Sequence, residues 1–212
     1  MNPRTDFTGA THEDIAAAVS EALRRQGITA VMSGGGCVSV YSDNKYQSDD
    51  LDFIDSYRDR FGIQRALSEI GFYSNQDRYF KNDTTKIYLE FPPGPVMIGN
   101  EFAKDPIDWE TPAGKIRMLN PTDCVKDRLV KFYVWNDAQA LYQALLVVAA
   151  QPVDFREIER WSIKSEGQKD RYKFFRSLAG KVLSRWSFEE SEVVELATDL
   201  MAQERIKKLG RS

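Results

Sequence analysis

The chain has 212 residues, enough for one large domain or for a core with a helical appendage, and either can bury a sizeable apolar core. A formal net charge of -3 excludes a generally basic surface, so any nucleic acid must meet a local patch. No apolar run approaches the roughly 20 residues of a membrane span, and no apolar signal region opens the chain, so we expect a cytoplasmic protein with no membrane contact.

Cysteine and histidine are scarce in this sequence. Cys37 and Cys124 are far apart along the chain, and His12 is the only histidine. So few thiol and imidazole groups disfavour thiol–histidine catalysis, and we expect no zinc site. Any chemistry must therefore use carboxylates, Lys or Arg side chains, hydroxyl groups or the backbone.

The first predicted element is a helix that Thr11 and Asp14 open as a capping box. Apolar residues recur on one face of this helix until Gly27 ends it. His12 falls in the first turn, where we expect it to face solvent. The helix should pack against the strand that follows.

An apolar strand over residues 28–32 leads into Gly34, Gly35 and Gly36. Three glycines leave a stretch of backbone that has no side chain to keep a ligand away. Residues 37–41 fit either a short helix or a strand, and residues 42–45 read as a loop.

Asp50 and Asp52 are separated by one apolar residue in the next predicted strand. Because side chains alternate along a strand, both carboxylates should leave one face while Leu51 and Phe53 leave the other. Two acids at one place favour a bound cation.

After a predicted helix over 59–70, which Gly71 ends, residues 72–91 read as strands joined by a hairpin turn. Glu90 lies in the last strand between two apolar residues, as a third acid. Pro92, Pro93 and Pro95 cannot continue a central strand, so the chain must turn beside Glu90, where a stiff loop could border a pocket.

A strand over 115–119 precedes a helix start at Asn120 and Pro121, and helical patterns follow to the end of the chain. The predicted helices cover 124–135, 138–150, 154–164, 170–183 and 188–209. We therefore predict an α+β fold, with a mixed β-sheet core over 1–119 and a helical C-terminal region over 120–212.

The order Gly34-Gly35, a helix-sized gap, then Ser48-x-Asp50-Leu51-Asp52-Phe53 resembles the signature of the DNA polymerase β-like nucleotidyltransferase superfamily. The spacing fits best the small bacterial nucleotidyltransferases of abortive-infection and toxin–antitoxin systems. Their pattern has an arginine two residues before the serine, and Tyr46 stands there in this chain. The resemblance covers the first half well and the helical half only loosely.

The resemblance implies a Mg²⁺-dependent enzyme that moves a nucleoside monophosphate from an NTP to a hydroxyl of RNA or protein. Asp50, Asp52 and Glu90 would be the catalytic residues and would hold two Mg²⁺ ions, because hard cations prefer oxygen ligands. The implied nucleotide-binding residues are the following: Gly34, Gly35, Gly36, Lys45, Ser48, Lys126 and Arg128. Arg78 and Lys131 are further candidate triphosphate contacts.

Other interpretations stay open. The missing arginine motivates a catalytically degenerate protein of the same fold that acts as a binding or regulatory, antitoxin-like partner, and a cognate partner protein suits either interpretation. The acids could also belong to an ordinary surface loop. A Walker A loop fails because Cys37 and Val38 follow the glycines, and a dinucleotide-binding loop fails because Ser39 stands at its third glycine.

Overall fold

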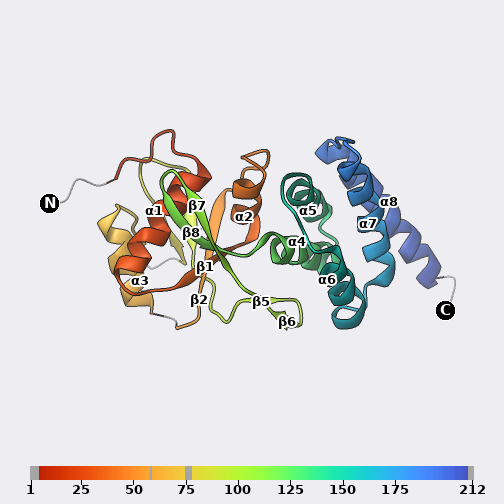
Figure 1. Ribbon diagram of the computed structural model, residues 1–212, viewed down its shortest axis with the longest axis horizontal. Helices are drawn as coiled ribbons and strands as arrows, with labels where there is room; N and C mark the ends of the chain where they lie inside the picture. The colour runs from red at the N-terminus through yellow and green to blue at the C-terminus, as the bar shows by residue number, and fades with distance from the viewer. Residues whose placement is uncertain (1–4, 58, 75–77, 210–212) are drawn as a thin grey trace.

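Figure 1 shows the computed structural model, which describes residues 5–57, 59–74 and 78–209. The main β-sheet occupies one half of the elongated molecule together with α1 and α3, α4 to α8 form the other half, and the β5–β6 hairpin lies beside α4. Helix α2 lies between the two halves. Among the described residues, no helix combines the length and apolar character that crossing a membrane requires.

A mixed sheet forms the centre of the first half, with strand order β3-β4-β2-β1-β8-β7. Its strands are β1 (Ala30–Ser33), β2 (Asp50–Asp55), β3 (Tyr79–Phe80), β4 (Tyr88–Glu90), β7 (Ile107–Thr111) and β8 (Gly114–Met118). Strand β2 runs parallel to β4 and antiparallel to β1, so the acidic segment lies in the middle of the sheet. A separate hairpin pairs β5 (Met97–Ile98) with β6 (Glu101–Phe102).

The helices largely follow the apolar patterns of the sequence. The first three are α1 (His12–Arg25), α2 (Gly34–Tyr41) and α3 (Arg60–Glu69). The C-terminal region holds α4 (Pro121–Trp135), α5 (Ala138–Ala150), α6 (Phe155–Arg160), the π-helical turn η1 (Trp161–Ser165), α7 (Lys169–Leu183) and α8 (Glu190–Leu209). The predicted α+β class, with a mixed sheet followed by helices, is confirmed.

Local sequence signals account for the ends of several helices. Thr11 and Asp14 form the predicted capping box of α1, and Asn120 caps α4 with Pro121 at its first position. Residues 37–41, which fit either a short helix or a strand in the sequence, belong to a helix that begins at Gly34. Strands β5, β6 and β7 were not predicted; β5 and β6 have two residues each, too few to show a period.

One apolar core runs through both halves of the molecule. Tyr41 at the end of α2 donates from its hydroxyl to the carbonyl of Leu119, and Gln151 after α5 donates to the carbonyl of Tyr41. The mixed structure gives way to helices between Met118 and Pro121. A division into separate domains at residues 119 and 120 stays a prediction.

Candidate active site

Three acidic side chains from β2 and β4 converge on one face of the sheet. Asp52 is paired with Glu90 in the parallel register of the two strands, and Asp50 lies two residues earlier on the same face. Each of the three offers a carboxylate oxygen, and these oxygens lie within 4.8 Å of one another. Leu51 and Phe53 point the other way and are fully buried in the core. Strand alternation therefore brings together the acids that the sequence singled out.

The electrostatics of this acidic cluster are unfavourable for its own charges. Burial, the charge of Asp50 and the charge of Glu90, in that order, raise the pKa of Asp52 from an ordinary 3.8 to about 6. Lys131 and Arg128 act in the opposite direction but do not cancel the rise in this pKa. The cluster therefore carries an excess of negative charge that a bound cation would relieve.

The glycine turn, which is Gly34 to Gly36 at the start of α2, lies directly against the acidic cluster formed by Asp50, Asp52 and Glu90. Gly34 has a φ of +73°, and a methyl group on its Cα would lie 2.5 Å from Oδ2 of Asp52. A methyl group on Gly35 would lie 2.6 Å from Oγ of Ser48. Only glycine fits both positions, because any side chain there would collide with the site. Ser33 forms no side-chain cap on α2, so the first N–H groups of this helix are available to an anion.

Ser48 connects the glycine turn to the acids. Its hydroxyl donates to Oδ1 of Asp50 at 3.0 Å, and its backbone N–H donates to Oγ of Ser39 at 3.1 Å. The Ser39 hydroxyl in turn donates to the carbonyl of Gly35 at 3.2 Å. Ser48 thus orients one carboxylate of the cluster.

His12 does not face solvent, and that expectation was wrong. Only 6% of the residue is exposed, because the first turn of α1 packs against the loop between α2 and β2. Nε2 of its ring lies 2.7 Å from the carbonyl oxygen of Ser48, and Nδ1 lies 3.1 Å from Oδ1 of Asn44. The sequence signal was the capping box itself, which fixes where the helix begins but not which loop covers its first turn.

Lys126 is shielded from solvent, in a position that does not suit the nucleotide-binding role that the resemblance implies. Its side chain is fully buried, and its ammonium group binds Asp123 at 2.9 Å and Glu157 at 3.5 Å. Because these contacts lie within the helical region, we leave Lys126 out of the proposed nucleotide site. The sequence shows that α4 carries basic residues, but not which of them its neighbouring helices bury.

Arg128 and Lys45 also take up positions that the sequence did not reveal. Arg128 is 3% exposed and donates to Asp127 and to Gln143 of α5, so it acts on Asp52 through its charge. Lys45 is exposed and lines a hollow of about 460 Å³ between the α2–β2 loop and the α7–α8 connection. The described contacts do not bring either side chain into the acidic cluster.

Arg78 and Tyr88 do lie at the acidic cluster. Nε of Arg78 is 3.3 Å from Oε1 of Glu90, on a side chain that is 67% exposed. Tyr88 is paired with Asp50 in the register of β2 and β4, and burial followed by the charge of Asp50 raises the pKa of its hydroxyl. The period-two pattern that selected Glu90 also places Tyr88 on this face, so this signal was present in the sequence.

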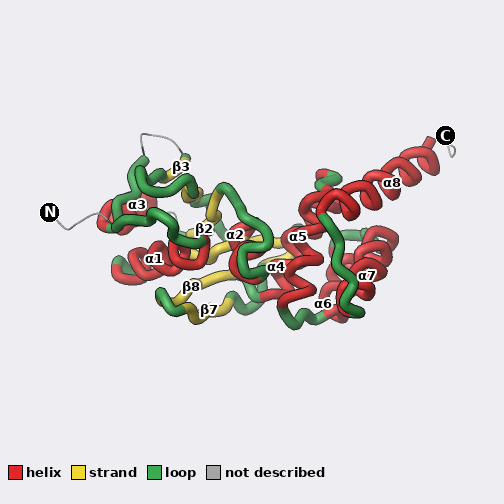
Figure 2. The backbone as a smooth tube through the Cα atoms, turned by 90° about the horizontal axis from the view of Figure 1, so that it is seen from above, coloured by secondary structure: helices red, strands yellow, loops and turns green. Residues whose placement is uncertain are grey.

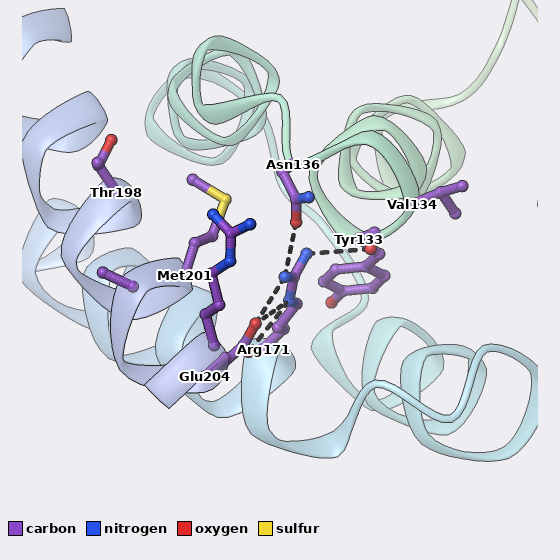
Figure 3. Close-up of a pocket in the computed structure, with 9 residues that line it drawn as sticks. Tyr133, Val134, Asn136, Arg171, Thr198, Met201 and Glu204 are labelled. Carbon is purple, nitrogen blue, oxygen red and sulfur yellow. Dashed lines mark hydrogen bonds and ion pairs between the residues drawn. The ribbon is translucent and has the colours of Figure 1, made fainter. Parts of the chain in front are cut away.

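Two further hollows lie outside the acidic cluster. One of about 740 Å³ lies between α4, α7 and α8, where Arg171 spans the gap (Figure 3). Its three guanidinium nitrogens donate to Glu204, to Asn136 and to the carbonyls of Phe132 and Tyr133. Arg171 therefore holds the helices together. A smaller hollow of about 340 Å³ includes Pro92 and Pro93, as predicted for a pocket bordered by that loop.

Two solved structures resemble this chain. They are the solution structure of the antibiotic-resistance factor ANT(2'')-Ia, at 13% identity and a TM-score of 0.45, and a crystal structure of ANT(2'')-Ia in complex with adenylyl-2''-tobramycin, at 14% and 0.43. The similar parts cover 82% and 76% of this chain and 95% and 94% of those chains. No family model matches the chain, and no curated protein matches it in sequence. At this level of similarity, the function must be argued from the site itself.

Proposed function

We propose that this protein is a Mg²⁺-dependent nucleotidyltransferase that moves a nucleoside monophosphate from an NTP to a hydroxyl of RNA or protein. The observation that carries the proposal is the convergence of Asp50, Asp52 and Glu90 beside a glycine turn that no side chain caps. The resemblance of the Gly-Gly and Ser-x-Asp-Leu-Asp pattern to nucleotidyltransferases supports the same interpretation.

The donor set fits a hard divalent cation. Carboxylate oxygens are the ligands that Mg²⁺ prefers, and three of them lie within 4.8 Å of one another. Burial and then the charges of Asp50 and Glu90 raise the pKa of Asp52, so ionised acids at this place are unfavourable until a cation offsets their charge. Bound Mg²⁺ would neutralise triphosphate charge and lower the pKa of the attacking hydroxyl.

The remaining roles fall to residues of this chain. The N–H groups at the start of α2 would bind the phosphate oxygens, and Ser48 would keep Asp50 in its ligating orientation. The acceptor oxygen would form a bond to the α-phosphorus as the bond to the pyrophosphate oxygen breaks, and pyrophosphate would leave. One of the three carboxylates would accept the proton from the acceptor hydroxyl.

The biological setting belongs to the same proposal. The short bacterial enzymes that the motif resembles come from abortive-infection and toxin–antitoxin systems, so we propose a cytoplasmic enzyme with a cognate partner protein. Whether RNA or protein receives the nucleotide is decided by a screen with each labelled NTP, Mg²⁺, cellular RNA and total protein.

The test of the chemistry compares Asp50→Asn with Asp49→Asn. Asp49 is an exposed neighbour outside the acidic cluster, so it controls for the loss of one negative charge in the same segment. Loss of a metal ligand removes several kcal/mol of transition-state stabilisation, so Asp50→Asn should lower transfer by roughly 10³-fold. Asp49→Asn should transfer at the normal rate. Undiminished transfer by Asp50→Asn overturns the proposed mechanism.

The second candidate function is a binding protein of the same fold that has lost catalysis. Tyr46, at the place of the motif's arginine, lies against the glycine turn: a methyl group on Gly35 would be 3.2 Å from Cε1 of Tyr46. A thermal shift with Mg²⁺ and each NTP distinguishes the two, since a ligand at 100 times its Kd adds about 2.7 kcal/mol. Stabilisation by an NTP favours the enzyme, and no shift with any nucleotide favours the antitoxin-like binding or regulatory partner.

A further inference from the structure

The only histidine of the chain lies at the start of α1 and contacts the loop that leads to the acids. Helices α1 and α2 lie side by side, and the loop from α2 to β2 passes the first turn of α1 (Figure 2). His12 is not part of the acidic cluster and does not contact its carboxylates. Its burial is unusual for a first-turn residue that the helix pattern alone would leave in solvent.

The contact between His12 and Ser48 has one possible direction. A backbone carbonyl oxygen can only accept a hydrogen bond, so Nε2 of His12 carries the hydrogen and donates it over 2.7 Å. The contact is buried, where such a hydrogen bond is stronger than in water and costly to leave unmade. The position of the Ser48 backbone therefore depends on the imidazole ring.

The loop that His12 holds has little regular structure of its own. Asp43 and Asn44 are consecutive residues with positive φ, at 53° and 56°, a backbone conformation that the surrounding contacts must maintain. Nδ1 of His12 lies against the Asn44 side chain, and the backbone N–H of Asn44 donates to the carbonyl of Ser39. The imidazole thus contacts the loop at two points, Asn44 and Ser48, and donates to it at Ser48.

A continuous series of hydrogen bonds leads from α1 to the acidic cluster. His12 donates to the Ser48 carbonyl, and the Ser48 hydroxyl donates to Asp50. Groups behind a metal ligand fix its orientation, and their loss commonly weakens metal binding by about 10- to 100-fold. We propose that His12 is a positioning residue, which acts through Ser48 to hold Asp50 in the orientation that binds the divalent cation. This inference rests on the proposed function, because it assigns the cation to the acidic cluster.

Two substitutions at His12 separate its two contacts. The amide nitrogen of glutamine can reach the place of Nε2 and donate to the Ser48 carbonyl, whereas the shorter asparagine side chain reaches only the place of Nδ1. His12→Gln should therefore keep Mn²⁺ binding within about threefold of the wild type, and His12→Asn should weaken it by about tenfold. The Kd for Mn²⁺ is measured by titration calorimetry on the full chain, below the unfolding temperature of each variant.

A double-mutant cycle tests whether the effect passes through Ser48. Ser48→Ala keeps the carbonyl that His12 binds but removes the hydroxyl that orients Asp50, and it should weaken Mn²⁺ binding by about 10- to 100-fold. Adding His12→Asn to Ser48→Ala should weaken binding no further. A full additional tenfold loss in the double variant shows that His12 acts by another route and overturns the inference.

The outcomes also separate this inference from the proposed function. Normal Mn²⁺ binding by His12→Asn, together with loss of binding in Asp50→Asn, overturns the role of His12 and leaves the enzyme proposal intact. Absence of Mn²⁺ binding by the wild type overturns both. Equal losses in His12→Gln and His12→Asn, despite the rescue expected from glutamine, mean that the ring only fills space in the core.

Discussion

Two groups of charged residues in this molecule are arranged in opposite ways. The acidic cluster brings the half-buried side chains of Asp50, Asp52 and Glu90 together on one face of the sheet. In the helical region, a charged network joins α4, α6 and the β5–β6 hairpin, and its acids are matched by Lys104, Lys126 and Arg160. Basic side chains therefore balance the charges of the acids in this network, whereas they do not balance those of the acidic cluster.

The pKa values of the acids differ accordingly. Hydrogen bonds from Arg160 and then from Ser165 lower the pKa of Glu101 to about 2. The hydrogen bond from Arg160 also holds the pKa of Glu157 well below its usual range. In the acidic cluster, burial and then the charges of Asp50 and Glu90 raise the pKa of Asp52 to about 6 instead. The paired acids of the helical region stabilise the folded state in their ionised form. The ionised acids of the acidic cluster do so only when a cation from solution binds them, and this is the physical basis for proposing a cation there.

The largest expected effect on stability comes from breaking the balanced network at Lys126. Its side chain is fully buried, so Lys126→Met leaves the acids that it binds without their buried cation. Removing one partner of a buried ion pair typically costs about 3 to 5 kcal/mol, and we expect a loss of that size in the free energy of unfolding by urea. Binding of Mn²⁺ should be unchanged in the folded variant. Weakened Mn²⁺ binding would show that the two charged groups are coupled.

The second prediction removes the unbalanced charge of Asp52. A pKa raised from 3.8 to about 6 means that the ionised carboxylate destabilises the folded state, by on the order of 3 kcal/mol at pH values above both pKa values. This cost is absent below pH 3.8 and is fully present above about pH 6. Asp52→Asn should therefore be more stable than the wild type at pH 7.5 with EDTA, and the advantage should disappear near pH 3.5.

Asp49→Asn is the matched control for this pH dependence, because Asp49 is exposed and lies outside the acidic cluster. Thermal unfolding of the three proteins across this pH range measures the difference. Saturating Mg²⁺ should reverse the order at pH 7.5, since it stabilises the wild type and not Asp52→Asn. A variant that is less stable than the wild type at pH 7.5 with EDTA contradicts the electrostatic account of the cluster.

The acidic cluster could be predicted because strand alternation is a local property. Asp50, Asp52 and Glu90 each follow from a period of two along their own strands, and the glycines mark a close approach of the backbone. The sequence could not predict that His12 binds Ser48 or that Lys126 binds Glu157, because these partners lie 36 and 31 residues further along the chain. Burial by a distant segment leaves no period in the sequence, so these environments appear only in the folded structure.

The smallest expected effect sharpens the comparison at the edge of the acidic cluster. Arg78 is 67% exposed and lies 3.3 Å from Glu90, so solvent screens this pair and Arg78→Gln should leave the unfolding free energy nearly unchanged. Because Arg78 competes with a cation for Glu90, its loss should tighten Mn²⁺ binding by about two- to threefold, and more at low salt than at high salt. Weaker Mn²⁺ binding would mean that Arg78 positions Glu90 for the cation. It would also mean that a residue of this chain, Arg78, already offsets the negative charge of the acidic cluster. A raised KM for the NTP with tighter Mn²⁺ binding would instead place Arg78 on the triphosphate, since one guanidinium can release Glu90 to the metal and bind phosphate in the same complex.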